Sequence, residues 1–296
     1  MDIKTGKFKV PHQKEKEIKL EDFATGQHRH KPDDNEINKT TDANIEEMQQ
    51  LQYNLYAANK QSILIVFQGM DSSGKDSAIR HIMSGLNPQG ALVHSFKAPS
   101  YLEMQHDYLW RHYIKLPENG QIVIFNRSYY ENVLISRVHP QLVLAEKVNK
   151  IVDLKDVDKK FWATRYRQIN NFEETLTENG TTILKFFLHL SKDEQRKRFL
   201  ERIEKRDKHW KFSNADIAER EHWDEYQKSY EKMLNHTSNK FAPWYVIPAD
   251  DKWFTHMLIS KIVTEHLTEM NPVLPPVTKE EQDLMNLAKE KLQNER

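Results

Sequence analysis

The stretch from Gly69 to Ser77, Gly-Met-Asp-Ser-Ser-Gly-Lys-Asp-Ser, has the residue types and spacing of a loop that binds phosphate. Glycines let backbone N–H groups converge on an anion, and a lysine after the second glycine supplies a movable cation. Gly69, Gly74 and Lys75 meet the spacing G-x-x-x-x-G-K. Asp76 stands where Ser or Thr normally binds magnesium, and Ser77 comes one place late. The predicted phosphate ligands are Ser72, Ser73, Gly74, Lys75, Asp76 and Ser77.

The stretches on either side of this loop predict the elements that hold it. The apolar run 63–67 is typical of a buried strand in a parallel sheet. The segment 76–84 places Ile79, Ile82 and Met83 on one side of a helix. Strand, glycine loop and helix is the order that a phosphate loop requires. A strand-to-helix turn with incidental glycines is the alternative, but it does not explain the three charged side chains in one short loop.

A second group of candidate residues follows the apolar run 121–125, which predicts another buried strand. Ligands of parallel sheets bind outside the carboxyl ends of the strands, and Asn126, Arg127 and Glu131 fall there. Phosphotransfer sites often carry an acid at this point to hold magnesium, whereas this chain has the neutral Asn126. Arginine suits phosphate because its planar fork binds two oxygens at once. Arg127 and Arg137 are therefore candidate phosphate or nucleotide ligands.

A capping box at residues 100–103 predicts a helix that carries residues 106–111. Arg111 lies four residues after Asp107, so the two side chains would pair on the helix surface. The alternative is that Arg111 reaches a phosphate. This stretch alone favours the surface pair.

The most basic stretch runs from Lys192 to Lys211, with nine Lys or Arg against five Asp or Glu. A capping box opens its helix, on which Arg198 and Arg202 share a face. A charge run of this kind is usually a solvated face. Here it follows the fourth predicted strand of a phosphate-loop sheet, where small kinases place a mobile lid. We therefore predict a lid over residues 191–215 that brings Arg198, Arg202 and Lys211 onto phosphates.

The remaining pattern predicts an α/β fold in which helices sandwich a five-stranded parallel sheet. The predicted strands are 63–67, 91–96, 121–125, 181–189 and 244–248, and the main further helices are 41–58, 158–178 and 253–267. We divide the chain into a polar arm (1–40), a domain (41–270), and a proline-containing linker with a C-terminal helix (271–296) that is a candidate for oligomer contacts. The arm includes the basic cluster His28–Pro32, which is interpreted as solvated rather than as a metal or anion site.

Composition restricts the possible functions. The 296 residues are 38% hydrophobic and 30% charged, with a formal net charge of zero, which argues against wholesale nucleic-acid binding. Cysteine is absent, so there is no disulfide framework, thiolate metal site or cysteine nucleophile. No apolar stretch approaches the roughly 20 residues of a membrane span, and the first residues do not look like a secretory signal. A cytoplasmic location is expected.

Taken together, these motifs resemble the polyphosphate kinase 2 family over about residues 45–270. The stretches that carry the resemblance are 69–76, 86–90, 106–111, 125–131, 184–195 and 242–249. The resemblance implies a thymidylate-kinase-like P-loop fold and transfer of phosphate between inorganic polyphosphate and a nucleotide with Mg²⁺ or Mn²⁺. Asp at position 76 is usual in the family. Asn126 and Glu131 look like the class III branch, which phosphorylates AMP and ADP, whereas many members have His where Tyr129 stands.

The chemistry of phosphoryl transfer suggests roles for these residues. Lys75 and the loop would hold the phosphates, Arg127 would stabilise charge on the transferred group, and Asp71 with Asp76 would hold the metal. The expected nucleotide ligands are Arg111, Asn126, Glu131 and Arg137. The expected partners are polyphosphate, AMP, ADP, ATP or guanine nucleotides, and further copies of the chain in a dimer or tetramer. Two alternatives remain open, an ATP-dependent nucleoside or nucleotide kinase and a sensor that binds without transfer.

Overall fold

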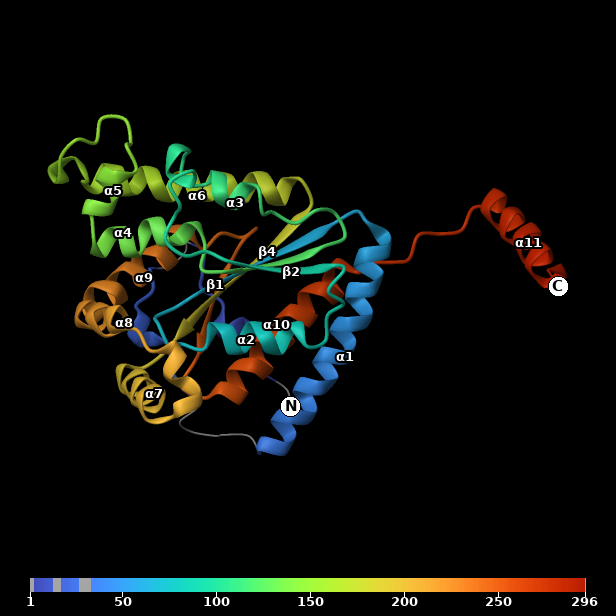
Figure 1. Cartoon of the computed structure of the whole chain (residues 1–296), viewed down its shortest axis with the longest axis horizontal. Coiled ribbons are helices and arrows are strands. Elements are labelled where there is room, and N and C mark those ends of the chain that lie inside the picture. Colours follow the sequence, from blue (N-terminus) through green and yellow to red (C-terminus); the bar gives the residue numbers. More distant parts are fainter. Residues whose placement is uncertain (1–2, 13–16, 27–32, 296) are drawn as a thin grey trace.

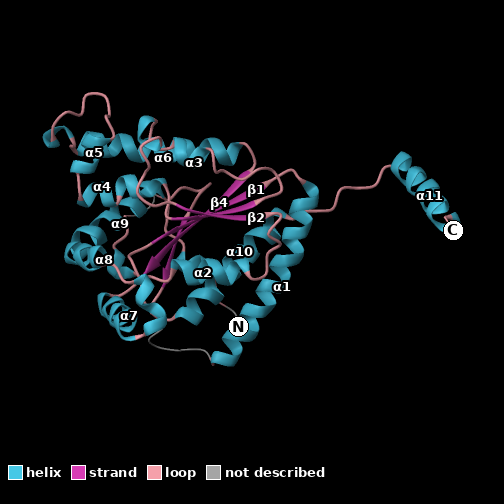
Figure 2. Ribbon diagram, viewed as in Figure 1, coloured by secondary structure: helices cyan, strands magenta, loops and turns pink. Residues whose placement is uncertain are grey.

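A computed structural model describes residues 3–12, 17–26 and 33–295 of the chain. Its centre is a parallel sheet with the strand order β2-β3-β1-β4-β5 (Figures 1 and 2). The strands are β1 (Ser62–Gln68), β2 (Ala91–Ser95), β3 (Ile122–Asn126), β4 (Thr181–His189) and β5 (Trp244–Pro248). The five predicted strands are confirmed, with ends that differ by at most one residue. The phosphate loop therefore follows the central strand.

Helices cover both faces of the sheet because successive strand residues point to opposite sides. Ile63, Ile65 and Phe67 of β1 pack with the helices of one face, whereas Leu64 and Val66 pack with those of the other. The first face is covered by α1 (Asp34–Ala58), α2 (Lys75–Met83) and α10 (Lys252–Met270). The second is covered by α6 (Lys159–Glu178) and α9 (Trp223–Thr237). The predicted sandwich is confirmed.

The remaining helices surround the carboxyl edge of the sheet or follow the main body of the fold. They are α3 (Trp110–Tyr113), α4 (Ile135–Val138), α5 (Gln141–Ala145), α7 (Lys192–Glu204), α8 (Asn214–Glu219) and α11 (Lys279–Asn294). The 3-10 turns are η1 (Thr5–Phe8), η2 (Leu20–Asp22), η3 (Glu103–Gln105), η4 (Tyr129–Val133), η5 (Leu154–Asp156), η6 (Arg206–Lys211) and η7 (Arg220–His222).

The described part of the expected polar arm packs on the body of the protein. Val10, Ile18 and Leu20 are buried, and the N–H of Val10 donates to the carbonyl of Trp244 at 2.8 Å. The segment thus covers β5, an edge strand whose free N–H and C=O groups would otherwise be open to pairing. Widely spaced apolar residues without a period gave no signal of this packing in the sequence. The cluster His28–Pro32 lies outside the described residues.

Two helices begin at places that the sequence did not predict. The first, α1, begins at Asp34 instead of residue 41, because the Asp33 side chain caps it by accepting from Asn35 N. The capping box at 100–103 forms, but only the short turn η3 follows it. Asp107 accepts from the N–H of Leu109 at 2.9 Å and starts a separate turn, after which the short helix α3 begins at Trp110. No continuous helix therefore connects the capping box with Arg111.

The C-terminal helix α11 stands away from the body of the fold (Figure 1). Leu284, Leu287 and Leu292 on this helix are more than half exposed. None of the helices in the described part of the chain is long and apolar enough to cross a membrane. The division of the chain into three segments stays a prediction.

Candidate active site

The phosphate loop is a tight turn between β1 and α2. Gly69 has φ +153°, and a Cβ there would lie 2.9 Å from the carbonyl oxygen of Leu188, so a larger residue has no room. Gly74 caps α2 with φ +101°, and Ser72 is in the left-handed region with φ +65°. The hydroxyl oxygens of Ser72 and Ser73 are buried and have no hydrogen-bond partner among the described residues. Unsatisfied buried hydroxyls in a loop at a helix N-terminus suit a ligand that accepts hydrogen bonds.

Lys75 begins α2 with its ammonium group folded back into the loop. Its Nζ donates to the carbonyl oxygens of Gly69 at 2.7 Å and Met70 at 3.1 Å. Burial lowers the pKa of Lys75 to about 8, and the positive charge of Arg127 acts in the same direction, while Asp71 opposes them. This cation is therefore held close to the loop by carbonyl groups that a phosphate ligand can replace.

Arg127 faces the loop from the end of the neighbouring strand. Phe67 of β1 pairs with Asn126 of β3, so the carboxyl ends of the two strands lie side by side. Arg127 Nη2 donates to Asp71 Oδ1 at 2.5 Å, and its Nη1 lies 3.6 Å from Glu131 Oε2. The negative charge of Glu131 raises the pKa of Arg127, and Asp71 adds to this against the effect of burial. Arg127 therefore stays charged and links the loop to the β3 edge.

The same strand pairing brings Asn126 to the second acid of the loop. The Asn126 side-chain amide donates to Asp76 Oδ1 at 2.8 Å. Ser77 points elsewhere, since its hydroxyl lies 3.1 Å from Nε2 of His256 on α10. One position further along α2 turns this side chain toward a neighbouring helix. Ser77 still lines the cleft, and its role as a phosphate ligand stays a prediction.

The two arginines of α7 have different surroundings. The Arg198 side chain is buried, and it donates to the carbonyl oxygens of Ser72 at 2.9 Å and Ala249 at 2.7 Å and to Glu194 at 2.9 Å. It also donates to the carbonyls of Ser73 and Asp250. Arg198 therefore supports the loop from behind. It also lines the cleft, and its contact with the transferred phosphate stays a prediction.

Arg202 lies one turn further along α7, at the cleft. Its Nη1 lies 3.2 Å from Asp216 Oδ2 and 3.4 Å from the carbonyl oxygen of Lys211. Burial raises the pKa of Asp216, and the charge of Asp71 adds to this, whereas Arg202 lowers it. The ammonium group of Lys211 stacks 5.0 Å from the Trp210 ring centre. Arg202 and Lys211 both line the cleft, as the lid prediction requires.

Of the two other predicted arginines, one lines the cleft and the other does not. Arg111 lies at the cleft, where its Nε is 3.3 Å from Glu103 and its Nη2 donates to the carbonyl of Lys97 at 2.9 Å. The expected pair with Asp107 is replaced by Glu103 because the helix is interrupted. Arg137 stacks on the Trp162 ring at 4.9 Å and is absent from the cleft lining, so its role as a nucleotide ligand stays a prediction without a contact to the cleft.

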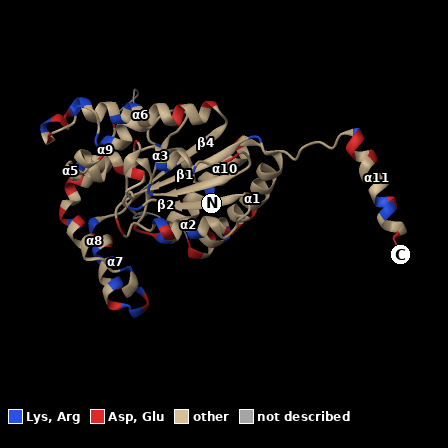
Figure 3. Cartoon of the chain, turned by 45° about the horizontal axis from the view of Figure 1, so that its top comes forward, with Lys and Arg blue, Asp and Glu red and all other residues tan. Residues whose placement is uncertain are grey.

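The phosphate loop, Arg127 and Arg202 line one cleft of about 2340 Å³. This is well above the roughly 300–1,000 Å³ of ordinary small-molecule pockets. Fifteen Lys or Arg and eleven Asp or Glu line it, an excess of four positive charges in a chain with no net charge. Figure 3 shows charged residues of both signs along α7 and beside α5. Lys97, Lys147 and Lys150 line the cleft without an ion pair among the described residues. The cleft thus suits a long polyanion.

A family model described as polyphosphate kinase 2 matches residues 31–275. The chain belongs to the polyphosphate kinase 2 family. This confirms the family that the sequence motifs predicted. The match covers the sheet, the phosphate loop and α7, and it leaves out α11.

Two curated relatives cover most of this polyphosphate kinase 2 chain. A Rhodopseudomonas palustris protein named ADP-polyphosphate phosphotransferase is 51% identical over 79% of this chain and 80% of its own length. A Meiothermus ruber protein named AMP/ADP-polyphosphate phosphotransferase is 45% identical over 74% and 77%. The crystal structure of polyphosphate kinase 2 from Arthrobacter aurescens TC1 matches with a TM-score of 0.84 at 31% identity, over 95% of this chain and 98% of that one. The predicted fold is confirmed.

The polyphosphate kinase 2 site offers a divalent metal only a small set of protein ligands. Among the described residues no group of three or more His, Cys, Asp or Glu could hold a metal ion. Asp71 and Asp76 nevertheless both line the cleft from the phosphate loop. Magnesium usually keeps several waters and binds through one or two carboxylates together with substrate phosphates. The two acids fit that mode of binding.

The structure also reveals a site residue that sequence reasoning missed. Gln195 of α7 is buried, donates to the backbone carbonyl of Asp71 at 2.9 Å and accepts from Arg220 at 2.6 Å. It therefore fixes the backbone of the loop acid. The sequence places Gln195 about one helical turn before Arg198, on the same face of the helix. This was a weak signal, because a single glutamine in a charged helix looks like any solvent-exposed residue.

Proposed function

We propose that this protein is a polyphosphate-dependent nucleotide kinase, which transfers phosphate from inorganic polyphosphate to AMP and ADP to give ADP and ATP. The observation that carries the proposal is the meeting of Lys75, Asp71 and Arg127 at one end of a cleft with excess positive charge. The family membership and the names of the two curated relatives support polyphosphate as the donor.

Two cations would stabilise the transition state. Phosphoryl transfer depends mainly on positioning and on neutralising charge at the transferred group. Lys75 would leave the loop carbonyls for the phosphate, which offers its ammonium a full negative charge instead of two dipoles. Arg127 would present its planar fork to the transferred group while Glu131 and Asp71 keep it oriented. A nucleotide phosphate is already ionised near neutral pH, so no strong general base is required.

The loop acids would hold Mg²⁺ or Mn²⁺ and orient the accepting phosphate. Bound there, the metal would offset the negative charge of the phosphates. Asp71 is kept in place by its backbone contact with Gln195 and by Arg127, and Asp76 by Asn126. The predicted phosphate ligands Ser72, Ser73, Gly74, Ser77 and Arg198 remain proposed, and the two buried hydroxyls without a partner support Ser72 and Ser73.

The long cleft would bind the polyphosphate chain. Arg202 and Lys211 of the segment after β4, and the unpaired Lys97, Lys147 and Lys150, supply cations at separate points of its lining. A polymer with one charge per repeat needs such a distributed set of contacts rather than one enclosed pocket. An ATP-dependent kinase would have less use for a cleft of this size.

The accepting site would tolerate both AMP and ADP. Asn126 is neutral, so it does not repel the additional charge of a diphosphate. Arg111 and Glu131 line the same cleft and remain proposed nucleotide ligands. Guanine nucleotides are further proposed acceptors.

We also propose a cytoplasmic homo-oligomer, a dimer or a tetramer, without a nucleic-acid or membrane partner. The exposed leucines of α11 are the surface that supports self-association. The zero net charge supports the absence of a nucleic-acid partner.

A donor exchange experiment tests the proposed activity. AMP or ADP is incubated with Mg²⁺ and either polyphosphate or, for AMP, ATP, and new nucleotide phosphates are measured by chromatography. We expect new nucleotide phosphates when polyphosphate is the only added phosphate donor. Transfer only from ATP would favour the nucleotide kinase alternative. Binding of polyphosphate without any product would favour the sensor.

A further inference from the structure

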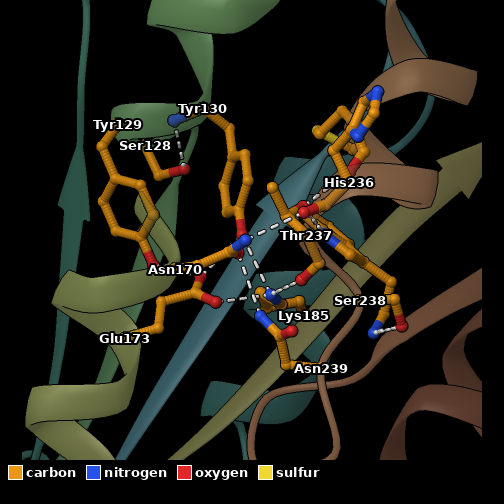
Figure 4. A network of polar contacts seen from close by, with 12 residues as sticks. Ser128, Tyr129, Tyr130, Asn170, Glu173, Lys185, His236, Thr237, Ser238 and Asn239 are labelled. Atoms are coloured by element: carbon orange, nitrogen blue, oxygen red, sulfur yellow. Dashed lines mark hydrogen bonds and ion pairs between the residues drawn. The ribbon is translucent and has the colours of Figure 1, made fainter. Parts of the chain in front are cut away.

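A buried charged network lies behind the site and has no part in the mechanism above (Figure 4). Lys185 in the middle of β4 and Glu173 on α6 are both completely buried, and Lys185 Nζ lies 2.6 Å from Glu173 Oε2. Aromatic side chains enclose the pair, with the rings of Tyr130 and Trp244 within 5.4 Å and 5.2 Å of the lysine nitrogen.

Every strong donor and acceptor of this network is satisfied. Lys185 Nζ also donates to the hydroxyl of Tyr130 at 2.9 Å and to the carbonyl of Thr237 at 2.7 Å. Glu173 Oε1 accepts from the hydroxyls of Tyr129 at 2.8 Å and Tyr130 at 2.7 Å. A buried ion pair is weak evidence for stability, because apolar side chains of similar volume often do as well. Its hydrogen bonds are directional, however, so they fix the orientation of the side chains that bond to Lys185 and Glu173.

The two groups so fixed are consecutive residues next to the site. Tyr129 and Tyr130 open the turn η4. They lie two and three residues after Arg127 and immediately before Glu131 in the chain. Both tyrosines are buried, and their hydroxyls end on one carboxylate oxygen. Ser128 between them and Arg127 caps the turn by accepting from Tyr130 N at 3.3 Å.

The backbone of Arg127 needs this support. Its φ of +62° lies in the left-handed region, which non-glycine residues adopt at a cost in conformational energy. The chain on its amino side is fixed by the bond from Arg127 N to Phe67 O at 3.1 Å. On its carboxyl side the hydroxyl of Ser128 is hydrogen-bonded to the side-chain amide of Gln68 at 3.1 Å, and the next anchored side chains are those of the two tyrosines.

We propose that Tyr129 and Tyr130, anchored on Glu173 and Lys185, are positioning residues that hold Arg127 and Glu131 in the geometry for phosphoryl transfer. The inference rests on the proposed function and deepens it. Loss of a tyrosine hydroxyl would let the η4 turn shift and would move the Arg127 fork off the transferred group. The main effect is on the contact of Arg127 with the transition state, so kcat changes more than substrate binding does.

The test compares two substitutions that each remove one buried tyrosine hydroxyl. Tyr130→Phe removes a hydroxyl of the network. The matched control Tyr245→Phe removes a hydroxyl that lies 2.9 Å from His266 Nε2, on the opposite face of the sheet. We expect Tyr130→Phe to lower kcat about tenfold, with KM for AMP and polyphosphate changed less than about twofold. We expect Tyr245→Phe to retain the wild-type kcat. An equal kcat in both variants, lowered or not, overturns the proposal.

A double-mutant cycle tests whether the network acts through Arg127. In an Arg127→Lys background, which has already lost the planar fork, Tyr130→Phe should cause less than about a twofold further loss of kcat. Multiplication of the two losses would overturn the proposal. If Tyr130→Phe does not fold, Tyr129→Phe takes its place, because Lys185 keeps all its acceptors in that variant.

Hydrogen exchange of the ligand-free protein separates this inference from the proposed activity. We expect Tyr130→Phe to speed exchange in peptides that cover residues 127–131, and Tyr245→Phe to leave those peptides unchanged. Unchanged exchange in both variants contradicts the positioning role. A wild type that makes no product from polyphosphate contradicts the proposed function instead, whatever the exchange result.

Discussion

At the scale of single residues, Lys75 combines a buried ammonium with a role in binding phosphate. Its nitrogen is bonded to two loop carbonyls and stands near Arg127, another cation. The folded protein therefore keeps a positive charge in a place where solvent cannot stabilise it. The buried positive charge favours an anion in the site, and the free energy needed to bury it has a measurable effect on the stability of the protein.

We expect the stability contribution of Lys75 to depend on pH. Its pKa falls from 10.5 to about 8 on folding. The unfolded chain thus binds more protons between these values, and the stability of the native state rises there. The destabilising effect is present below about pH 8 and is lost as the pH rises toward 10.5. Relative to Lys75→Met, the wild type should gain about 3 kcal/mol in unfolding free energy over this range. Urea denaturation at several pH values measures this gain, and a difference between the two proteins that stays constant with pH would be the contrary result.

The Lys75→Met variant should also lack transfer activity while remaining folded.

We expect Asn126→Asp to change the choice of acceptor. The new carboxylate would face Asp76 across the present 2.8 Å hydrogen bond, so two like charges would meet. Use of ADP relative to AMP should fall about tenfold, because a diphosphate adds further negative charge. Initial rates with each acceptor measure the ratio. Asn44→Asp, on α1 where the amide contacts Ser260, is the control and should keep the wild-type ratio. An unchanged ratio in Asn126→Asp would remove this residue as the cause of a dual acceptor range.

The residue types of the site were predictable from the sequence, but their partners were not. Glycine spacing and flanking apolar runs indicated Lys75 and Asp71, since local chain geometry decides a phosphate loop. The pairs of Arg127 with Asp71 and of Asn126 with Asp76 depend on the register between β1 and β3. No local pattern encodes that register for a parallel pair whose strands are buried on both faces.

At the scale of elements, α7 has two functions on adjacent turns. Arg198 joins the loop to the residues after β5, because its guanidinium reaches carbonyls on both. Arg202 joins α7 to α8 through Asp216 and remains at the cleft. The helical spacing correctly placed Arg198 and Arg202 on one face of α7. It did not show that Arg198, which is nearer to the loop, is buried whereas Arg202 is partly exposed.

We expect separate effects from substituting these two arginines. Arg198→Lys should lower the free energy of unfolding by about 3 kcal/mol, because buried carbonyls lose charged hydrogen-bond donors. Arg202→Gln should cost less than about 1 kcal/mol, as expected for a partly exposed ion pair. It should raise KM for polyphosphate, more for longer chains, and added salt should mimic the change. Denaturation and initial rates measure the two effects. Equal stability losses, or no change in KM for Arg202→Gln, would contradict this assignment.

Other elements show where local signals stop being sufficient. The capping box at 100–103 was recognised and forms, yet the helix ends after one turn, since Asp107 starts a competing turn. The N-terminal segment carried no periodic pattern, although Val10 and Leu20 are buried against the body. Long helices with a strong apolar period, such as α6, were predicted almost to the residue.

At the scale of the whole molecule, α11 lies outside the region that the family model matches and apart from the body of the fold. We expect a chain that ends at residue 275 to keep its kcat and to change in unfolding free energy by less than about 0.5 kcal/mol. If α11 joins copies of the chain, the truncated protein should form a smaller assembly in light scattering. An unchanged assembly mass would exclude α11 as the oligomer contact.

The time course of nucleotides formed from AMP, polyphosphate and Mg²⁺ in the absence of added ATP tests the central claim most directly. The site should accept AMP and then ADP at the same transfer point, so free ADP should appear first and ATP should follow as ADP declines. Lys75→Ala, folded by circular dichroism, should form neither product. Accumulation of ADP without ATP would contradict the dual acceptor range, and wild type that leaves AMP unchanged would contradict the polyphosphate-dependent kinase itself.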